Sequence, residues 1–299
     1  MSDYTNYPVT GFVYKSVYNL LDANPHLMNE PNKEKNALIY IVNWPYGFGS
    51  ALIVYLQNII FLRTINEDIV ALPHYSKNTE NFKYHDESTA NSFFHYFNYK
   101  QTVDVTKKKI YFCNAMVLDD FPKFTFTIPI QNTVMNKQIV NVFTNTFSFK
   151  LNDKVKKYMD FIRQTGKELI GIHIRSLHQK RCENPVYMNI SFETRLSKLK
   201  NIIMQKHKNA VLFIATDVEI YLYKMKELFG KVEYFNYIER IYNEQDSIPQ
   251  LDKYKGHKLG RDIIDDCYAL SLCDKIYISN SNIPFMVTLM NKDICMEEY

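Results

Sequence analysis

The chain has 299 residues, 46% of them hydrophobic and 23% charged, which is the composition of an ordinary globular protein and not of a disordered or fibrous one. This length suits one large domain or two domains of about 150 residues each. The formal net charge of +4 is too small to predict nucleic-acid binding, because proteins that bind nucleic acid concentrate basic residues on one face. We therefore expect no nucleic-acid partner.

The sequence also argues against a membrane protein and against a secreted protein. No apolar run approaches the roughly 20 residues that a membrane-spanning helix needs, and the first residues lack a secretory signal pattern. The five cysteines (Cys113, Cys182, Cys267, Cys273 and Cys295) contain no CxxC pair, so neither a disulfide framework nor a zinc cluster is expected. We expect a cytoplasmic protein without a transmembrane segment, and the sequence leaves its oligomeric state open.

In the first half of the chain, short apolar runs rich in β-branched residues predict strands. They lie at 36–43, 69–73, 109–112 and 124–130. A turn with two of the chain's 8 glycines, Gly47 and Gly49, follows the first run. Ser50 is then the expected N-cap of a buried helix over 51–63. The sequence does not determine the order of these strands in a sheet.

The second half alternates strands and helices more clearly. Strands are predicted at 168–175, 210–216, 231–237 and 274–279, and helices at 153–165, 192–206, 218–229, 261–273 and 282–291. The polar stretch 238–260 is expected to be a long loop. This alternation predicts an α/β fold with parallel sheets and helices on both faces. We place an N-terminal domain at 1–165 and a C-terminal domain at 166–299.

Polar residues gather where three strands of the C-terminal domain end. The first strand carries His173 and Arg175 on one face, by the two-residue period of a strand. The second ends at Asp217, and the third runs through Ser279 into a helix N-terminus. Ligands bind at the carboxyl ends of strands in open α/β sheets, and a helix N-terminus with an arginine suits a phosphate. We therefore predict an anion-binding site at this edge.

Each of these residues also has an ordinary structural explanation. An arginine at a strand end commonly forms a surface ion pair, and Asp217 could be only the N-cap of the next helix. The run Ser279-Asn280-Ser281-Asn282 could be only a turn. Because all three features are expected at one edge of one sheet, we favour the ligand site over three unrelated explanations.

These segments resemble the conserved blocks of a known enzyme family. The first block is Gly171-Ile172-His173-Ile174-Arg175 and the second is Phe213 to Asp217. The third combines Asp266 to Ile276 with Ser279-Asn280-Ser281-Asn282. In this order they look like the three conserved blocks of the GDP-fucose-dependent fucosyltransferases, which include α1,6, α1,2 and protein O-fucosyltransferase branches. The turn at Gly47 and Gly49 is similar to the glycine-rich turn of the same enzymes.

The resemblance implies a GT-B-like glycosyltransferase with two facing Rossmann-type domains and an inverting, metal-independent transfer of fucose from GDP-fucose to a glycan or protein-linked hydroxyl. Arg175 would bind the β-phosphate, while His173 and Asp266 would contact guanine. The remaining donor-binding residues implied are Gly47, Gly49, Asp217, Ser279, Ser281 and Asn282. No cofactor is expected besides the GDP-sugar donor and the glycan acceptor.

The chemistry of the transfer favours these residue types independently of the family. Negative charge accumulates on the departing diphosphate, so a fixed guanidinium stabilises the transition state. A carboxylate is needed to accept the acceptor's proton. Glu183 is our candidate base, because it lies ten residues after His173, the offset of the proposed base in the α1,6 branch. A solvent-facing loop glutamate is the alternative interpretation.

Two departures from the family pattern leave alternatives open. His178 stands where the family usually has an acidic residue, and Val218 follows Asp217 where a second aspartate is common. A GT-B transferase with another nucleotide sugar and a catalytically inactive binding protein therefore remain rival interpretations. Metal catalysis has little support, because His74, His85 and His95 are scattered.

Overall fold

The computed structural model describes residues 8–9, 12–29, 37–42, 47–75, 91–101, 103, 108–118, 133–176, 192–242, 256–279 and 281–299. The chain forms two compact units. The first consists of Met1–Thr127, Gln131–Lys150 and Lys255–Gly260, and the second of Ile128–Ile130, Leu151–Tyr254 and Arg261–Tyr299. The main division thus falls between residues 150 and 151, earlier than the predicted boundary at 165/166. The helix over 153–163 belongs to the second unit because it packs there, as Arg163 ion-pairs with Asp274 at 3.0 Å.

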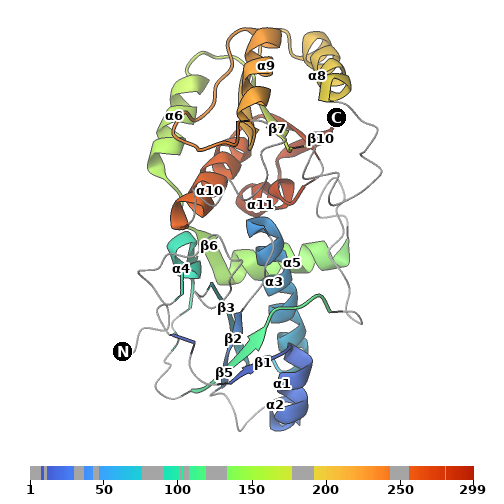
Figure 1. The fold of residues 1–299 in the computed structure, drawn as a ribbon. Helices are drawn as coiled ribbons and strands as arrows, with labels where there is room; N and C mark the ends of the chain where they lie inside the picture. The colour runs from blue at the N-terminus through green and yellow to red at the C-terminus, as the bar shows by residue number, and fades with distance from the viewer. Residues whose placement is uncertain are drawn as a thin grey trace. The chain divides into compact units, whose positions relative to one another are not determined.

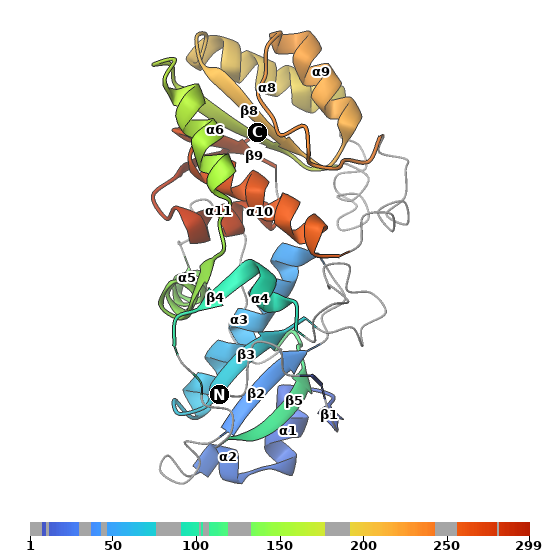
Figure 2. The same cartoon turned by 90° about the vertical axis from the view of Figure 1, so that its left-hand side faces the viewer.

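The first unit is built on a parallel four-stranded sheet (Figures 1 and 2). Its order is β1 (Val13–Tyr14), β5 (Lys109–Asn114), β2 (Ala37–Val42) and β3 (Val70–His74). All six residues of β2 are buried, as expected for a central strand covered on both faces. The predicted strands at 36–43, 69–73 and 109–112 are confirmed within one or two residues. The strand predicted at 124–130 lies outside the described residues.

The long helix α3 (Phe48–Ile65) follows β2 and differs from the prediction at its start. Gly47 occupies the N-cap position, so Ser50 lies in the first turn and is not the cap. The helix is long and apolar enough to cross a membrane by length and composition, but 72% of it is buried within the protein. Burial on nearly all sides is what a core helix between sheet and neighbouring helices requires.

The rest of the first unit was not predicted from the sequence. It comprises α1 (Val17–Ala23), α2 (His26–Asn29), α4 (Phe93–Tyr96), α5 (Val134–Thr146) and an antiparallel pair, β4 (Phe97–Tyr99) with β6 (Phe147–Phe149). Aromatic rings pack between these elements, as where Phe93 stacks on Phe97 with ring centroids 4.5 Å apart. Most of these elements are short and depend on tertiary contacts, so local patterns indicate them weakly.

The second unit contains another parallel four-stranded sheet. Its order is β10 (Cys295–Glu298), β9 (Lys275–Ile278), β7 (Leu169–Ile174) and β8 (Val211–Thr216). Its helices are α6 (Asp153–Arg163), α8 (Phe192–Lys206), α9 (Glu219–Phe229), α10 (His257–Ser271) and α11 (Ile283–Met290). The two parallel sheets with their helices confirm the predicted α/β class. The edge strand β10 was not predicted.

Local capping residues mark the ends of two helices in this unit. Asn152 caps α6, its side chain accepting a hydrogen bond from the Lys154 N–H at 3.1 Å. Gly166 and Gly230 adopt left-handed φ values of 67° and 73° after α6 and α9. The predicted strand at 231–237 is wrong, because this segment pairs with β8 only through a single bridge at Glu233. The loop predicted over 238–260 ends earlier, since α10 begins at His257.

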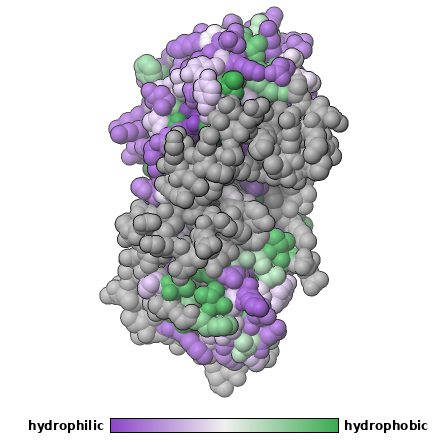
Figure 3. All heavy atoms as spheres, viewed as in Figure 1, coloured by the Kyte–Doolittle hydropathy of each residue, from purple (hydrophilic) through white to green (hydrophobic). Residues whose placement is uncertain are grey.

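Helices cover both faces of the second sheet (Figures 1 and 2). On one face Ile170, Ile172 and Ile174 form an apolar cluster with α8 and α9. On the other face Gly171 lies against α10: a Cβ added there would lie 2.8 Å from Leu270 Cδ2. In Figure 3 the described surface of this unit is mostly hydrophilic with scattered apolar residues. The core therefore lies between the sheet and its helices, and the strand ends are left for polar residues.

Candidate functional site

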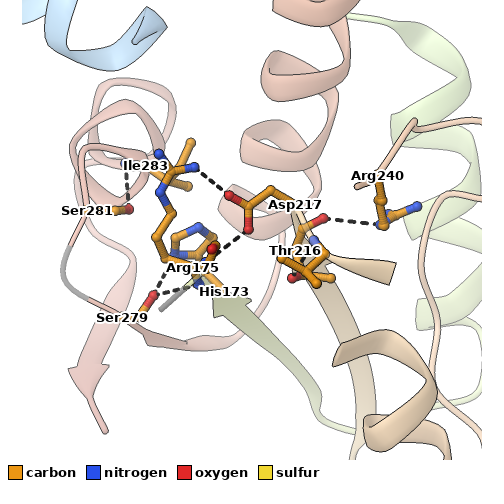
Figure 4. A network of polar contacts seen from close by, with 10 residues as sticks. His173, Arg175, Thr216, Asp217, Arg240, Ser279, Ser281 and Ile283 are labelled. Atoms are coloured by element: carbon orange, nitrogen blue, oxygen red, sulfur yellow. Dashed lines mark hydrogen bonds and ion pairs between the residues drawn. The ribbon is translucent and has the colours of Figure 1, made fainter. Parts of the chain in front are cut away.

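The three adjacent strands β9, β7 and β8 end side by side, and the predicted polar residues follow directly after them (Figure 4). Arg175 Nη1 lies 2.6 Å from Asp217 Oδ2. The Arg175 N–H donates to Ser279 Oγ at 2.9 Å, and the Ser176 N–H donates to Asp217 Oδ1 at 3.0 Å. The structure thus brings together one residue from each predicted strand end.

The guanidinium of Arg175 remains available to a ligand. Its side chain is 29% exposed, and that of Asp217 is 34% exposed. Only Nη1 takes part in the ion pair, so Nε and Nη2 can still donate hydrogen bonds. Asp217 therefore orients the guanidinium and leaves two of its nitrogens free to bind a ligand. Asp217 is not the N-cap of α9, which was the alternative interpretation, because Val218 occupies that position.

His173 is held inside the sheet edge on the same strand face as Gly171. It is 5% exposed, and its Nδ1 lies 3.5 Å from Ser279 Oγ. Its carbonyl oxygen accepts hydrogen bonds from the Ser279 N–H and the Tyr299 hydroxyl, both at 3.2 Å. Ser279 therefore contacts both members of the His-x-Arg pair and restrains their spacing.

Ser281 and Asn282 lie at the start of α11, as predicted. The Ser281 hydroxyl accepts a hydrogen bond from the Ile283 N–H at 3.2 Å (Figure 4). Asn282 occupies the N-cap position without a side-chain cap bond. A hydroxyl that accepts one bond can still donate its own proton to an anion. These two residues flank the helix N-terminus that follows Ser279.

Asp266 projects from α10 into a strongly polar environment. Burial raises the pKa of its carboxyl to about 8, and the positive charge of Arg240 opposes this increase. The carboxylates of Asp262, Asp265 and Asp217 raise the pKa further. Its buried Oδ1 has no hydrogen-bond partner. Asp266 is therefore a partly buried carboxyl whose buried Oδ1 is an unused acceptor within electrostatic reach of the strand-end residue Asp217.

Arg240 belongs to this site although no sequence pattern selects it. Its Nε donates to the Thr216 carbonyl at 3.1 Å (Figure 4). Its Nη1 donates to the carbonyls of Phe235 and Ile238 at 3.0 and 2.9 Å. It thereby ties the segment after α9 to the end of β8. An arginine within a polar stretch carries no local signal of such a role, because its partners are backbone carbonyls brought close only by folding.

A separate shallow pocket of about 400 Å³ lies elsewhere in the second unit and was not predicted. It is lined by Lys154, Tyr158, Glu233, Tyr234, Phe235, Asn236 and Tyr237. The Tyr158 hydroxyl donates to Glu233 Oε2 at 2.5 Å, and burial together with this bond raises the pKa of the phenol. None of the predicted site residues lines this pocket.

Three other predicted site positions lie in the first unit or outside the described residues. Glu183, the candidate base, falls outside them, as does His178. Gly47 and Gly49 are in the first unit, at the start of α3. Gly47 has φ −58°, a value open to most residues, so the backbone there does not demand glycine.

Among the residues that the structure describes, no three His, Cys, Asp or Glu side chains are grouped so that they could hold a metal ion. The four cysteines in this part of the chain, Cys113, Cys267, Cys273 and Cys295, are free thiols. Burial raises the pKa of the first three well above the ordinary value, which makes them poor nucleophiles. The polar chemistry of the second unit thus centres on arginine, aspartate, histidine and serine.

Fold and site together define an α/β protein with a cationic, hydrogen-bonding centre at the carboxyl edge of a parallel sheet. No family model and no curated protein matches the chain. Among solved structures, it is similar to NodZ α-1,6-fucosyltransferase co-crystallised with GDP (10% identity, TM-score 0.47, covering 86% of this chain and 93% of that one). It is also similar to a mutant of FUT1 from Arabidopsis thaliana in complex with GDP (9%, 0.44, 93% and 74%), and to a family 9 glycosyl transferase from Veillonella parvula (8%, 0.39, 90% and 82%).

Proposed function

We propose that the protein is an inverting glycosyltransferase that transfers fucose from GDP-fucose to a hydroxyl of a glycan or of a protein-linked acceptor. The observation that carries this proposal is the oriented guanidinium of Arg175, held by Asp217 at 2.6 Å and backed by Ser279 at the end of three parallel strands. An arginine held at this edge and still open to a ligand is suited to a diphosphate.

In this proposal Arg175 acts on the leaving group. The acceptor oxygen attacks the anomeric carbon on the face opposite the diphosphate, and the bond from that carbon to the β-phosphate oxygen breaks. The electron pair passes to the GDP, where the guanidinium stabilises the new charge without any proton transfer. Because the Asp217 pair orients the side chain before the reaction, little reorganisation is needed as the charge develops.

The same edge of the sheet carries side chains that could bind the remaining phosphate and the guanine base of the donor. Ser281, Asn282 and the N-terminus of α11 would contact phosphate, while His173 and Asp266 would read the guanine base. A carboxylate suits guanine because the base presents two adjacent N–H donors, and Asp266 Oδ1 is an unused buried acceptor. Gly47 and Gly49, in the first unit, are proposed as donor-binding residues on the family resemblance alone.

Glu183 is proposed as the general base that accepts the acceptor's proton. This assignment rests on its sequence offset from His173, and a variant can test it separately from donor binding. Glu183→Gln should abolish transfer and leave GDP binding unchanged, because a base acts only on the acceptor. Weakened GDP binding in this variant would contradict the assigned role.

Two rivals need to be separated from this proposal. A transferase for another nucleotide sugar would retain the diphosphate contacts and differ in base or sugar. A catalytically inactive binding protein would bind nucleotide without releasing GDP; it is suggested by His178 replacing the usual acidic residue. Comparing the affinities for GDP and UDP by calorimetry shows which nucleotide base the site prefers. An assay of sugar transfer distinguishes an active transferase from an inactive binding protein.

The decisive experiment is a donor screen with purified protein. GDP-fucose, GDP-mannose and UDP-sugars are supplied with and without a panel of glycan acceptors, and GDP or UDP release is measured. We expect GDP release from GDP-fucose that increases with a suitable acceptor and disappears in Arg175→Ala. An absence of GDP binding, or transfer unaffected by Arg175→Ala, would refute the proposal.

A further inference from the structure

The shallow pocket of the second unit has the composition of a ligand site. Four of its seven lining residues are aromatic, and the other three are Lys154, Glu233 and Asn236. Its volume of about 400 Å³ lies within the range of small-molecule sites, which are apolar surfaces with a few polar groups and hold about 300–1,000 Å³. All seven residues belong to the second unit, so the pocket is complete within it.

The pocket lies where the segment 231–237 passes α6. This segment meets β8 through a single bridge between Glu233 and Phe213 and does not continue as a strand. Tyr158 of α6 contacts the same segment: its hydroxyl donates to Glu233 Oε2 at 2.5 Å, and its ring centroid lies 5.6 Å from that of Phe235. The helix and the segment are therefore tied to each other beside the pocket.

Two aromatic rings of the pocket are fixed in position by the protein itself. Phe235 is 5% exposed and packs against the buried Phe213 of β8 with ring centroids 5.1 Å apart. Tyr237 stacks on Phe235 at 5.3 Å with an interplanar angle of 25°, and its hydroxyl donates to Asp265 Oδ2 at 2.9 Å. Tyr237 is nevertheless 44% exposed. A ring that is both anchored and exposed binds a ligand at little cost in conformational entropy.

The hydrogen bonds that hold these phenols persist near neutral pH. Burial raises the pKa of Tyr158 and of Tyr237 above the ordinary value, and their carboxylate partners Glu233 and Asp265 raise it further. Both phenols therefore remain protonated and keep donating. Asn152 Nδ2 also donates to Asp265 Oδ2 at 2.9 Å, which fixes the acceptor of the Tyr237 hydroxyl.

The polar groups of the pocket carry balanced charge and can accept further hydrogen bonds. One cation, Lys154, and one anion, Glu233, line it. Glu233 binds Tyr158 and Lys231, the latter at 3.1 Å, but a carboxylate has about four acceptor positions. Within the described part of the chain, the Lys154 ammonium and the Asn236 side chain form no hydrogen bond or ion pair. The three groups together suit a neutral ligand with several hydroxyls.

We propose that this pocket binds a ring of a neutral oligosaccharide. A pyranose ring has C–H groups on its face, which pack on the electron-rich face of an aromatic ring, and the exposed ring of Tyr237 provides that surface. The sugar hydroxyls match Glu233, Asn236 and Lys154, which offer both acceptors and donors. A purely apolar ligand would leave these groups unpaired, and a nucleotide would bring phosphate charge toward Glu233. The site is separate from the centre at Arg175 and does not depend on sugar transfer.

Calorimetry and saturation-transfer NMR with tetrasaccharides test this site. The probes are tetrasaccharides of glucose, of mannose and of N-acetylglucosamine. We expect the wild-type protein to bind at least one of them, with saturation transfer concentrated on the C–H protons of one sugar ring. In Tyr237→Ala the affinity should fall by at least about tenfold, because the stacking surface is lost. Circular dichroism and the Tm show whether this variant is folded.

Tyr223→Ala is the matched control. Tyr223 has a similar exposed fraction, 50%, and belongs to α9 of the same unit, but it does not line the pocket. This variant should keep the wild-type affinity. Asn236→Ala is a second test, which holds if Tyr237→Ala does not fold: Asn236 is exposed, so its removal should leave the fold intact and lower the affinity several-fold.

Four results would overturn the proposal. The first is a wild type that binds none of the three tetrasaccharides, and the second is an unchanged affinity in both Tyr237→Ala and Asn236→Ala. The third is competition by GDP, which would place the sugar at the strand-end centre. The fourth is preference for a tetrasaccharide of galacturonic acid, because the Lys154 charge would then select the ligand.

This inference and the proposed function can fail separately. Arg175→Ala should bind the tetrasaccharide as the wild type does, and Tyr237→Ala should bind GDP as the wild type does. Saccharide binding without any GDP binding would refute the proposed function and leave the pocket assignment intact. Loss of saccharide binding in Arg175→Ala would show that the pocket is not an independent site.

Discussion

Arg175 is the residue on which the proposed chemistry depends, and its ion pair with Asp217 is partly exposed to solvent. Ion pairs of this kind contribute only about 0–1 kcal/mol to stability. The pair's importance is therefore geometric, and substitutions at Arg175 should change ligand binding far more than folding. Comparing the binding of GDP with that of guanosine, which has no phosphate, separates an effect on phosphate binding from an effect on folding.

Arg175→Ala should weaken GDP binding by about tenfold or more, corresponding to about 1.4 kcal/mol, because a charge-assisted phosphate contact is lost. Guanosine affinity should stay unchanged, since guanosine has no phosphate. Isothermal calorimetry with both ligands measures the ratio. Equal loss for guanosine and GDP would show that the variant damages the site as a whole.

Asp266 predicts an unusual pH dependence of stability. Its pKa is about 8 in the folded protein, under the combined influence of burial, Arg240, Asp262, Asp265 and Asp217. The folded state then holds a proton that the unfolded state loses near pH 4, so the free energy of unfolding falls as pH rises from about 4 to about 8. The slope from this group is about 1.4 kcal/mol per pH unit.

Urea unfolding at pH 6 and pH 8 tests this, with Asp266→Asn as the comparison. The variant should lose this contribution to the slope and be more stable than the wild type at pH 8, because an amide carries no charge to bury. An unchanged slope would mean that Asp266 is ionised throughout this range.

The same residue leads to a prediction for ligand binding. If the carboxylate form of Asp266 accepts hydrogen bonds from guanine, GDP affinity should increase with pH up to about 8 and level off above it. Asp266→Asn should bind more weakly and without this dependence on pH. Titrations of GDP between pH 6 and pH 9 provide the test, and a wild-type affinity independent of pH would exclude Asp266 as the guanine acceptor.

Among the secondary-structure elements, β7 is constrained by its glycine. A Cβ at Gly171 would lie 2.8 Å from Ile276 Cγ2, 2.8 Å from Leu270 Cδ2 and 3.0 Å from Cys273 Sγ. Side chains in a packed core can yield only slightly, so Gly171→Ala should destabilise the protein by about 1–3 kcal/mol. It should also displace His173 and Arg175, which the same strand positions.

Gly166 is the matched control, because it has φ 67° and nothing within 4 Å of an added Cβ. Gly166→Ala should cost about 1 kcal/mol through backbone strain and leave GDP binding unaffected. Chemical denaturation measures both costs, and calorimetry measures the binding. Wild-type GDP affinity in Gly171→Ala would show that the strand end tolerates the shift.

Element prediction succeeded where the signal was local. The helix α8 was predicted with its observed bounds, and the predicted helix at 153–165 starts at the observed first residue of α6, Asp153. It failed at 231–237, whose apolar residues match a strand but lie beside the edge strand β8 with one bridge only. Whether a strand-like segment joins a sheet depends on a free partner edge, which no local pattern contains.

At the scale of the whole molecule, we expect GDP binding to change hydrogen exchange mainly in the second of the two compact units. Hydrogen exchange with and without GDP should show protection at the ends of β7, β8 and β9 and at the start of α11, because these segments carry the proposed contacts. The buried strands β2, β3 and β5 should exchange as before. Protection confined to the first unit would contradict the placement of the donor site.

The sequence by itself determined the α/β class, the main strands of both units and the candidate residues His173, Arg175, Asp217 and Ser279. It could do so because strand runs, helix caps and residues at strand ends are local features, and parallel strands place their carboxyl ends on one edge. The tertiary structure alone decided that Asp217 orients Arg175 and that Arg240 holds the end of β8. It also decided that the Oδ1 atom of Asp266 is buried without a hydrogen-bond partner. Burial, pKa and ion pairing depend on which distant segments meet, and only the folded chain determines those distances.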